Sequence, residues 1–526
     1  MQMTYAVAMS TYEAFRVALG RDLNWGFDTP KGQPARLKIY PFFAEQQNAY
    51  YDREAGAVKF GWYVSKGTVE RKYLDGSIRS VSLREGKVFT ALSHDIVVHE
   101  ISHALLDGLR PNFLKPYHRD TLAFHEGFAD LVAVFQHFSH RDLVAAAIRQ
   151  SKGAIEQSDL LTDIARQFGQ TQDSVSRALR TAIDSIERNK DDAENGKDSS
   201  GRQRNCYEAD KPIHHLGSVL VSAVFEAFTT IFKRKTQKYI NLATGGTGVL
   251  PEGNLSPELS DILAKEASKL AQQFLSICIR AIDYCPPVAV TFGDYLRALI
   301  TADFDLVPSD PYGYREALID AFILRNVPIE GVDTISESTL LLEMKYEEVN
   351  KELLSAILSE REIATMVQDP AHRFEARARR VRDYLAGSGD HDFETLGLVD
   401  PDNPPEGVQS IGDLVVESAR ISRRVGPDNR LETDLVVEVT QEVTVHVDGH
   451  PFPVLQGATV IFDDRGRFRY VIKKDTIRTL DSKRDLRKIQ AMASRYWHLS
   501  HGVWVENIAL VRKIHEDGFS FETTPI

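Results

Sequence analysis

The chain has 526 residues, of which 43% are hydrophobic and 26% are charged, and its formal net charge is -12. These fractions are typical of globular proteins and exclude general disorder, and the length predicts two or three domains. The negative charge argues against a nucleic-acid-binding protein, whose affinity depends on a positive surface. The three cysteines, Cys206, Cys278 and Cys285, have no metal-binding spacing, so no disulfide framework is expected.

The first 19 residues lack the features of a targeting segment. They contain no basic start followed by a long apolar stretch, and Glu13 and Arg16 interrupt the apolar residues. No apolar run reaches the length of a membrane span. We therefore expect a cytoplasmic protein that does not act at a membrane.

Residues 36–93 have the pattern of short β-strands. Apolar and polar residues alternate at 37–40 and at 58–64, and Asp75-Gly76 is a hairpin signal. The sequence therefore predicts a strand-rich N-terminal lobe.

An H-E-x-x-H pentad follows at His99-Glu100-Ile101-Ser102-His103, inside an apolar run with helical spacing over 95–109. Positions four apart on a helix lie one turn above each other. Both imidazoles can then face one metal ion, while Glu100 faces the water that the ion binds. This is the layout of a zinc hydrolase; the alternative is a surface helix with solvated charges.

A second run with helical spacing extends from Leu122 to Phe135. Catalytic zinc takes three protein ligands and leaves one position for water, so a third ligand must come from a neighbouring element. Glu126 and Asp130 are four residues apart in this run and share one face of the predicted helix. One carboxylate can bind the metal while the other orients a ligand.

The two segments together resemble the thermolysin-like zinc metallopeptidases, the gluzincins. The resemblance implies that His99, His103 and Glu126 bind one catalytic Zn²⁺ ion and that Glu100 is the general base. It also implies that Asp130 does not bind the metal itself but accepts a hydrogen bond from a ligand histidine, which makes that imidazole a better donor.

Three other positions match the family more weakly. Asn48 and Ala49, which precede two tyrosines, are similar to a turn and edge strand that bind the substrate backbone in that family. Tyr117 stands where the family has a tyrosine that contacts the oxyanion; the alternative is a loop aromatic that packs on the surface. Asp107 stands where the family also has an aspartate, and we expect it to support a metal ligand without binding the metal itself. The alternative is a helix-surface or capping carboxylate.

The doublet His214-His215 resembles a family segment whose histidine stabilises the oxyanion. The register of Ala223-Val224-Phe225 favours His214, whereas the spacing from Asp210 favours His215. Either ring is alternatively a core imidazole with satisfied hydrogen bonds.

The resemblance covers about residues 36–328 and implies an α+β catalytic domain. Its strand-rich lobe and zinc-site helices fall within 1–140, and a helical lobe falls within 141–328. Helical patterns are at 141–186, 216–232, 257–284, 291–298 and 314–322. A polar stretch at 189–205 reads as a lid, a cleavage site or a plain linker. The secreted thermolysins carry a signal and a pro-segment, from which this chain departs.

The C-terminal part resembles no family that we recognise and contains no catalytic constellation. A helical and linker region is expected over 329–407, followed by an antiparallel β-rich domain over 408–526. Alternation over 415–474, with turns at 448–449 and 464–466, predicts a sheet with one solvent-exposed face. A helix at 483–496 and a strand at 503–511 follow. We expect this region to bind a protein partner or to regulate activity.

The sequence thus predicts an intracellular zinc endopeptidase that acts on proteins or peptides. Two alternatives remain open at this point. One is a catalytically inactive scaffold that keeps the metalloprotease shape, and the other is a zinc hydrolase of a non-peptide amide, because the pentad reports on water activation and not on the acyl group.

Overall fold

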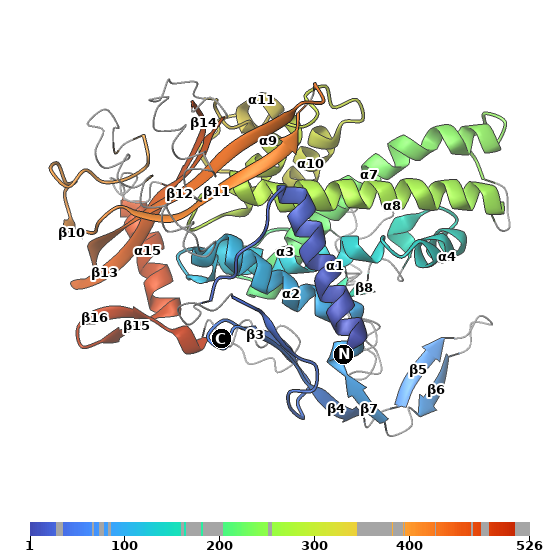
Figure 1. Cartoon of the computed structure of the whole chain (residues 1–526), viewed down its shortest axis with the longest axis horizontal. Helices are drawn as coiled ribbons and strands as arrows, with labels where there is room; N and C mark the ends of the chain where they lie inside the picture. Colours follow the sequence, from blue (N-terminus) through green and yellow to red (C-terminus); the bar gives the residue numbers. More distant parts are fainter. Residues whose placement is uncertain are drawn as a thin grey trace, which may run out of the picture.

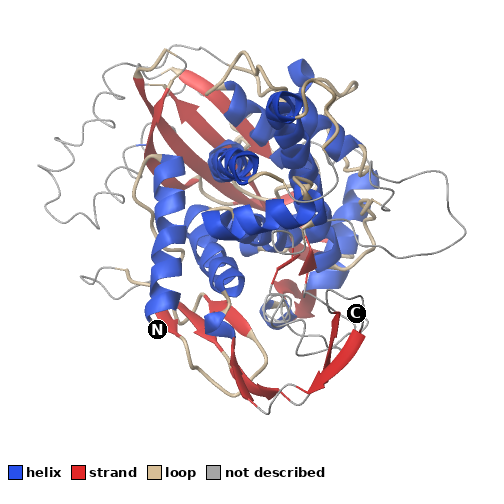
Figure 2. Ribbon diagram, turned by 90° about the vertical axis from the view of Figure 1, so that its right-hand side faces the viewer, coloured by secondary structure: helices blue, strands red, loops and turns tan. Residues whose placement is uncertain are grey.

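Helices and antiparallel strands occupy separate parts of the protein, so the predicted α+β class is confirmed (Figure 1). In both views the helices lie between one large sheet and a set of short N-terminal strands (Figures 1 and 2). The computed structural model describes residues 1–27, 35–65, 68–72, 78–82, 86–158, 163–164, 180–181, 204–250, 255–344, 381, 393, 395–426, 428–463, 467–474 and 483–510.

The chain begins with a helix that the sequence analysis did not predict, α1 (Gln2–Leu19). It ends at Gly20, whose φ of 64° is the left-handed conformation that stops helices. Phe15 and Leu19 are fully buried, and the Phe15 ring meets the Phe128 ring edge to face. Apolar residues at helical spacing before Gly20 were the available signal.

Short strands follow, as predicted for residues 36–93. A three-stranded sheet has the order β1-β3-β2, so β2 is one of its edges. β5 and β6 pair in antiparallel fashion on either side of the predicted Asp75-Gly76 turn, which itself lies outside the described residues. The strands are β1 (Lys38–Tyr40), β2 (Ala49–Asp52), β3 (Ala57–Phe60), β4 (Trp62–Ser65), β5 (Thr68–Lys72), β6 (Ile78–Ser82) and β7 (Gly86–Phe89).

The two helices that carry the zinc-site motifs lie at the centre of the protein. They are α2 (His94–Leu109) and α3 (Arg119–His137), preceded by the 3-10 turns η1 (Thr90–Leu92) and η2 (Pro111–Leu114). Every α2 residue from Ile96 onward is buried, and so is nearly all of α3. Helices buried on all sides belong to a core. The alternative of a surface helix with solvated charges is therefore wrong.

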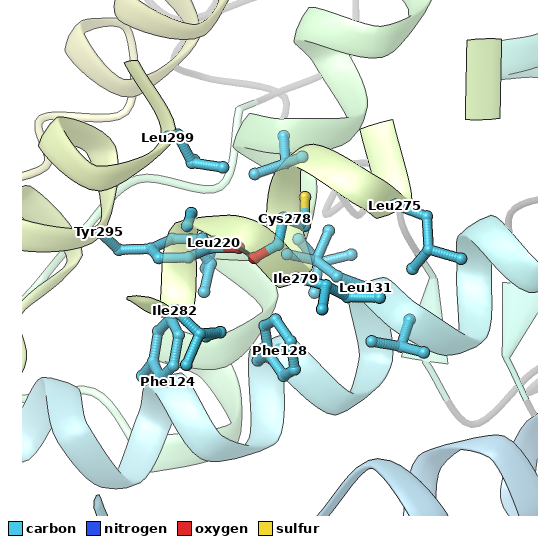
Figure 3. Packing of buried hydrophobic residues seen from close by; sticks show 14 of the residues in the cluster. Phe124, Phe128, Leu131, Leu220, Leu275, Cys278, Ile279, Ile282, Tyr295 and Leu299 are labelled. Carbon is cyan, nitrogen blue, oxygen red and sulfur yellow. Dashed lines mark hydrogen bonds between the residues drawn. The ribbon is translucent and has the colours of Figure 1, made fainter. Parts of the chain in front are cut away.

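A helical layer covers α3, as predicted for the second lobe. The helical prediction over 141–186 is wrong in part: the α-helix ends at Ser151, and short strands occupy 163–164 and 180–181. Phe124 and Phe128 of α3 point toward Tyr295 and the neighbouring helices, and the Tyr295 hydroxyl donates to the Cys278 carbonyl oxygen at 3.0 Å (Figure 3). The layer and its flanking elements are α4 (Arg141–Ser151), η3 (Ile155–Gln157), β8 (Asp163–Ile164), β9 (Arg180–Thr181), α7 (Ile213–Ala243), α8 (Pro257–Ala281), η4 (Ile282–Tyr284), α9 (Phe292–Phe304), α10 (Tyr314–Ile323) and α11 (Glu337–Leu340).

Helix α7 is the only described helix long and apolar enough to cross a membrane. Of its most apolar window, 78% is buried inside the protein. A buried core helix meets the same criteria of length and composition, and α7 packs on α3, α8 and α10.

The C-terminal sheet is antiparallel, as predicted, and the Asp448-Gly449 turn joins β12 to β13. Positive φ angles of 51° and 79° at these two residues suit a tight hairpin turn. Strands β12, β13 and β14 follow one another in the sheet, with β10 and β11 both paired to β12. The strands are β10 (Val408–Ile411), β11 (Val415–Val425), β12 (Leu431–Val447), β13 (His450–Phe462) and β14 (Phe468–Lys474).

The expectation of one solvent-exposed face on this sheet is wrong. Val436 and Ile461 belong to the same buried cluster as α2 and α3, whereas Val437 and Val460 belong to a second cluster that includes Leu398. Polar strand residues are buried too, including Glu438, Thr440, Gln441, Gln456 and Thr459. The sheet is therefore covered on both faces, and one of them packs on the helical body.

The chain continues through α15 (Lys483–Tyr496) into a hairpin of β15 (Trp497–Ser500) and β16 (Val503–Glu506). The helix agrees with the prediction, whereas the strand predicted over 503–511 ends at Glu506. Most of the predicted 189–205 loop and of the charged helix after 337, and the predicted turn at 464–466, lie outside the described residues.

Candidate metal centre

Helices α2 and α3 run antiparallel and bring the two motifs together. His94 lies beside His137, His99 beside Asp130, and His103 beside His125, so numbers rise along one helix as they fall along the other. Because both helices are buried, their polar side chains meet in the interior. The predicted ligands His99, His103 and Glu126 form one buried group whose candidate ligand atoms all lie within 4.8 Å of one another.

The distances within this group match the chemistry of a tetrahedral metal ion. His99 Nε2 lies 2.9 Å from His103 Nε2, 3.6 Å separates His99 Nε2 from Glu126 Oε2, and 3.5 Å separates His103 Nε2 from Glu126 Oε1. Two donors that bind one tetrahedral zinc at about 2.0–2.1 Å lie about 3.3 Å apart. The three distances, of which the last two end on different Glu126 oxygens, lie on either side of that value, so the His2Glu donor set fits zinc.

The other ring nitrogen of each histidine has a partner outside the group. Asp130 Oδ1 lies 2.8 Å from His99 Nδ1, where it orients that ring and directs Nε2 toward the group. Asp130 therefore stands where the sequence analysis placed it. His103 Nδ1 lies 2.7 Å from Nδ1 of the fully buried His125. The sequence analysis did not assign a role to His125, although its position next to Glu126 was the available signal.

Glu100 and Glu126 are almost fully buried, with exposed fractions of 2% and 1%. The exposed fractions of His99 and His103 are 1% and 4%. Burying a carboxylate is costly unless it is paired or binds a metal. The burial of two carboxylates and two imidazoles in one interior site therefore requires compensating interactions, such as those with a metal ion.

His214 of the doublet contacts this group. Its Nδ1 lies 3.4 Å from Glu126 Oε2, and its side chain is 33% exposed, so the ring borders both the site and the solvent. The alternative of a core imidazole is wrong for His214 because the ring is only partly buried.

Helix α7 approaches α3 unusually closely beside His214. A Cβ atom added to Gly127 would lie 2.7 Å from the Gly217 carbonyl oxygen, and one added to Gly217 would lie 3.1 Å from the Ala123 carbonyl oxygen. Real Cβ contacts are essentially never shorter than 3.0 Å. Glycine at both positions therefore lets the helix that carries His214 approach the helix that carries Glu126.

Replacing Gly127 by alanine should separate these helices. Alanine normally stabilises a helix by about 1 kcal/mol relative to glycine, but overpacking costs about 1–3 kcal/mol. We expect Gly127→Ala to lower the free energy of unfolding, and Gly217→Ala to have a smaller effect because its contact is longer. Denaturant unfolding of both variants measures this, and a stabilised Gly127→Ala protein would contradict the close packing.

Asp107 is fully buried at the far end of α2, so its alternative as a helix-surface carboxylate is wrong. Its Oδ2 accepts a hydrogen bond from the Tyr51 hydroxyl at 2.8 Å, and its Oδ1 lies 3.4 Å from Arg53. Burial, with the nearby Asp107 charge, raises the pKa of Tyr51 and keeps this hydroxyl protonated. These contacts attach the edge strand β2, which contains Ala49, to the ligand helix α2.

Ala49 is the first residue of that edge strand, and Asn48 directly precedes it. Ala49 pairs with Phe60 of β3, and the Asn48 carbonyl oxygen accepts a hydrogen bond from the Gly61 nitrogen at 2.8 Å. In the described sheet, β2 pairs with β3 on one side only. A peptide strand could pair with the main chain of β2 on its opposite side, as peptides do when they add to a sheet edge.

Tyr117 is placed differently from the other predicted residues. Its ring packs on Trp497 of the C-terminal hairpin, with centroids 5.6 Å apart, and on Leu455 of β13. Burial raises the pKa of its hydroxyl, and Glu442 and Glu506 add to the effect. Tyr117 also packs on Val288 and Ala289 of the helical lobe. No contact with His99, His103 or Glu126 is found among the described residues, so its oxyanion role remains a prediction.

Models of known protein families give no match to this chain, and a search of curated proteins gives no significant relative. The assignment of the site consequently depends on its residues and their geometry alone.

Proposed function

We propose that the protein is a zinc-dependent endopeptidase with a thermolysin-like catalytic domain. The observation that carries the proposal is the buried triangle of His99, His103 and Glu126, with edges of 2.9, 3.5 and 3.6 Å. A closed structural zinc site commonly has four protein ligands, whereas three leave one position for water. Further support comes from Glu100, which the pentad places between the two histidines.

A bound zinc ion would supply Lewis acidity and lower the pKa of a water ligand to about 7. Glu100 would accept the proton of the attacking water and pass it to the leaving amine nitrogen. His214 would donate a hydrogen bond to the substrate carbonyl oxygen as its negative charge grows. Asp130 and His125 would hold the imidazoles of His99 and His103 in orientation.

The proposed substrate is an extended protein or peptide segment. Ala49 begins an edge strand, directly after Asn48, that is joined to α2 through Tyr51 and Asp107. A peptide added at that edge would lie next to the helix of the general base. Main-chain pairing of this kind recognises peptides and would not recognise a small amide.

We further propose that the enzyme acts in the cytoplasm and that the C-terminal region selects or restrains its substrates. The support for the second part is the contact of Trp497 with Tyr117, which precedes α3. A hairpin at this position touches the connection between the two ligand helices.

The test of the proposed function is cleavage of a diverse peptide library by the full-length chain, with its metal content measured in parallel. We expect chelator-sensitive cleavage that returns when zinc is added. Bound zinc without any cleaved peptide would favour the inactive scaffold, and cleavage of small amides alone would favour the non-peptide hydrolase.

Asp130→Asn tests the orientation of His99. Loss of a carboxylate partner of a ligand histidine typically weakens metal affinity about 10–100-fold. We expect that change in a zinc competition assay against a chelator, and no change for Asp320→Asn, which alters an exposed aspartate on α10. Equal affinities for both variants would show that Asp130 does not support the ligand.

A further inference from the structure

A second group of metal-ligand side chains lies where α2 begins and α3 ends. His94 and Asp95 open α2, and His137 closes α3. Candidate ligand atoms of these three residues all lie within 4.8 Å of one another, and His137 Nε2 is 3.2 Å from Asp95 Oδ1. His140, just before α4, adds a third imidazole whose ring centroid is 4.8 Å from that of His94.

We propose that this group, His94, Asp95, His137 and His140, binds a second divalent transition-metal ion, with zinc as the favoured ion. Three imidazoles and one carboxylate are a donor set for zinc, whereas calcium and magnesium prefer oxygen ligands. Two imidazoles on one tetrahedral ion have centroids about 5 Å apart. The centroid of the His94 ring lies 4.8 Å from that of His140 and 5.9 Å from that of His137.

The N-terminus of α2 has a positive partial charge and the C-terminus of α3 has a negative one, so the two helix dipoles largely cancel at this group. The negative charge that favours a cation there comes from the Asp95 carboxylate.

The position of the group assigns it a structural role. His94 precedes His99 by five residues, which is about 7.5 Å along a helix. Co-catalytic metal pairs lie about 3.5–4 Å apart, so this ion would not share a substrate with the first site. With His140 as the fourth donor, a tetrahedral ion would have no open position. The ion would clamp the start of α2 to the end of α3 and so hold the two ligand helices in register.

Counting bound zinc in the full-length chain tests the proposal. After equilibrium dialysis against low micromolar zinc, we expect two ions per wild-type chain and one in the double variant His94→Gln, His137→Gln. The matched control is His498→Gln, which changes an exposed histidine on β15 and should leave two ions. An equal number of bound ions in the wild type and in the double variant would overturn the proposal.

A second measurement leaves the proposed ligands unchanged. The variant His103→Gln, Glu126→Gln removes the first site, and circular dichroism verifies its fold. Titration with cobalt should then give the visible absorption of one tetrahedral ion per chain, lost when His94→Gln and His137→Gln are added. Absence of that absorption in the folded first-site variant would refute the second site, whatever the peptide-cleavage assay shows for the proposed function.

Discussion

Glu100→Gln should reduce peptide hydrolysis about a hundred- to ten-thousand-fold while the chain keeps its zinc. Glutamine preserves the shape of the side chain but cannot accept the proton of the attacking water, and general acid-base catalysis contributes about that factor. The ligands His99, His103 and Glu126 are unchanged, so metal affinity should stay near the wild-type value. The measurement is kcat on a fluorogenic peptide, with zinc content determined on the same sample.

The matched control for this variant is Glu406→Gln, which changes an exposed glutamate outside the helical body. It should retain wild-type turnover and zinc. Unchanged turnover in Glu100→Gln would remove this residue from the mechanism. Loss of zinc together with turnover would instead make Glu100 a ligand, in conflict with the triangle assigned to the other three residues.

Arg110→Ala should lower the free energy of unfolding by about 3–5 kcal/mol. Arg110 follows the last residue of α2 and is 1% exposed, and its Nη1 lies 3.0 Å from both Glu438 Oε1 and Thr459 Oγ1. Its Nε donates to the Ile282 carbonyl oxygen at 3.1 Å. Removing one partner of a buried ion pair leaves an incompletely compensated charge, which is why the cost is large.

The control for this variant is Arg430→Ala, because Arg430 and its partner Asp428 have side chains 85% and 54% exposed. Exposed pairs contribute at most about 1 kcal/mol. Denaturant unfolding of both variants should therefore separate them clearly. Equal midpoints would show that the contact between the C-terminal sheet and α2 contributes little to stability, for instance because Arg420, 2.9 Å from Glu438, compensates.

The buried polar residues of the C-terminal sheet explain the main error of the sequence analysis. Alternation of Val437 and Val439 with Glu438 and Thr440 is normally the pattern of a half-solvated strand. Here Glu438 is buried because Arg110 and Arg420 pair with it. Arg110 follows α2, far from residue 438 in the sequence, and Arg420 lies on the neighbouring strand β11. The residue pattern of β12 alone could therefore not reveal the pairing.

The shared faces of the paired residues within each helix were predictable because their constraints are local, whereas the grouping of Glu126 with the two histidines was implied by the family resemblance. Turn spacing within α2 places His99 and His103 on one face, and the spacing of Glu126 and Asp130 does the same in α3. The partners that depend on helix packing were harder to foresee. His125 was missed because its contact with His103 arises only from the antiparallel register of α2 and α3.

The most direct test of the central claim is a crystal structure of the full-length chain with anomalous diffraction data at the zinc edge. We expect an anomalous peak about 2.0–2.2 Å from His99 Nε2, His103 Nε2 and a Glu126 carboxylate oxygen. Crystals grown with zinc that show no peak among these three side chains would contradict the proposed catalytic centre.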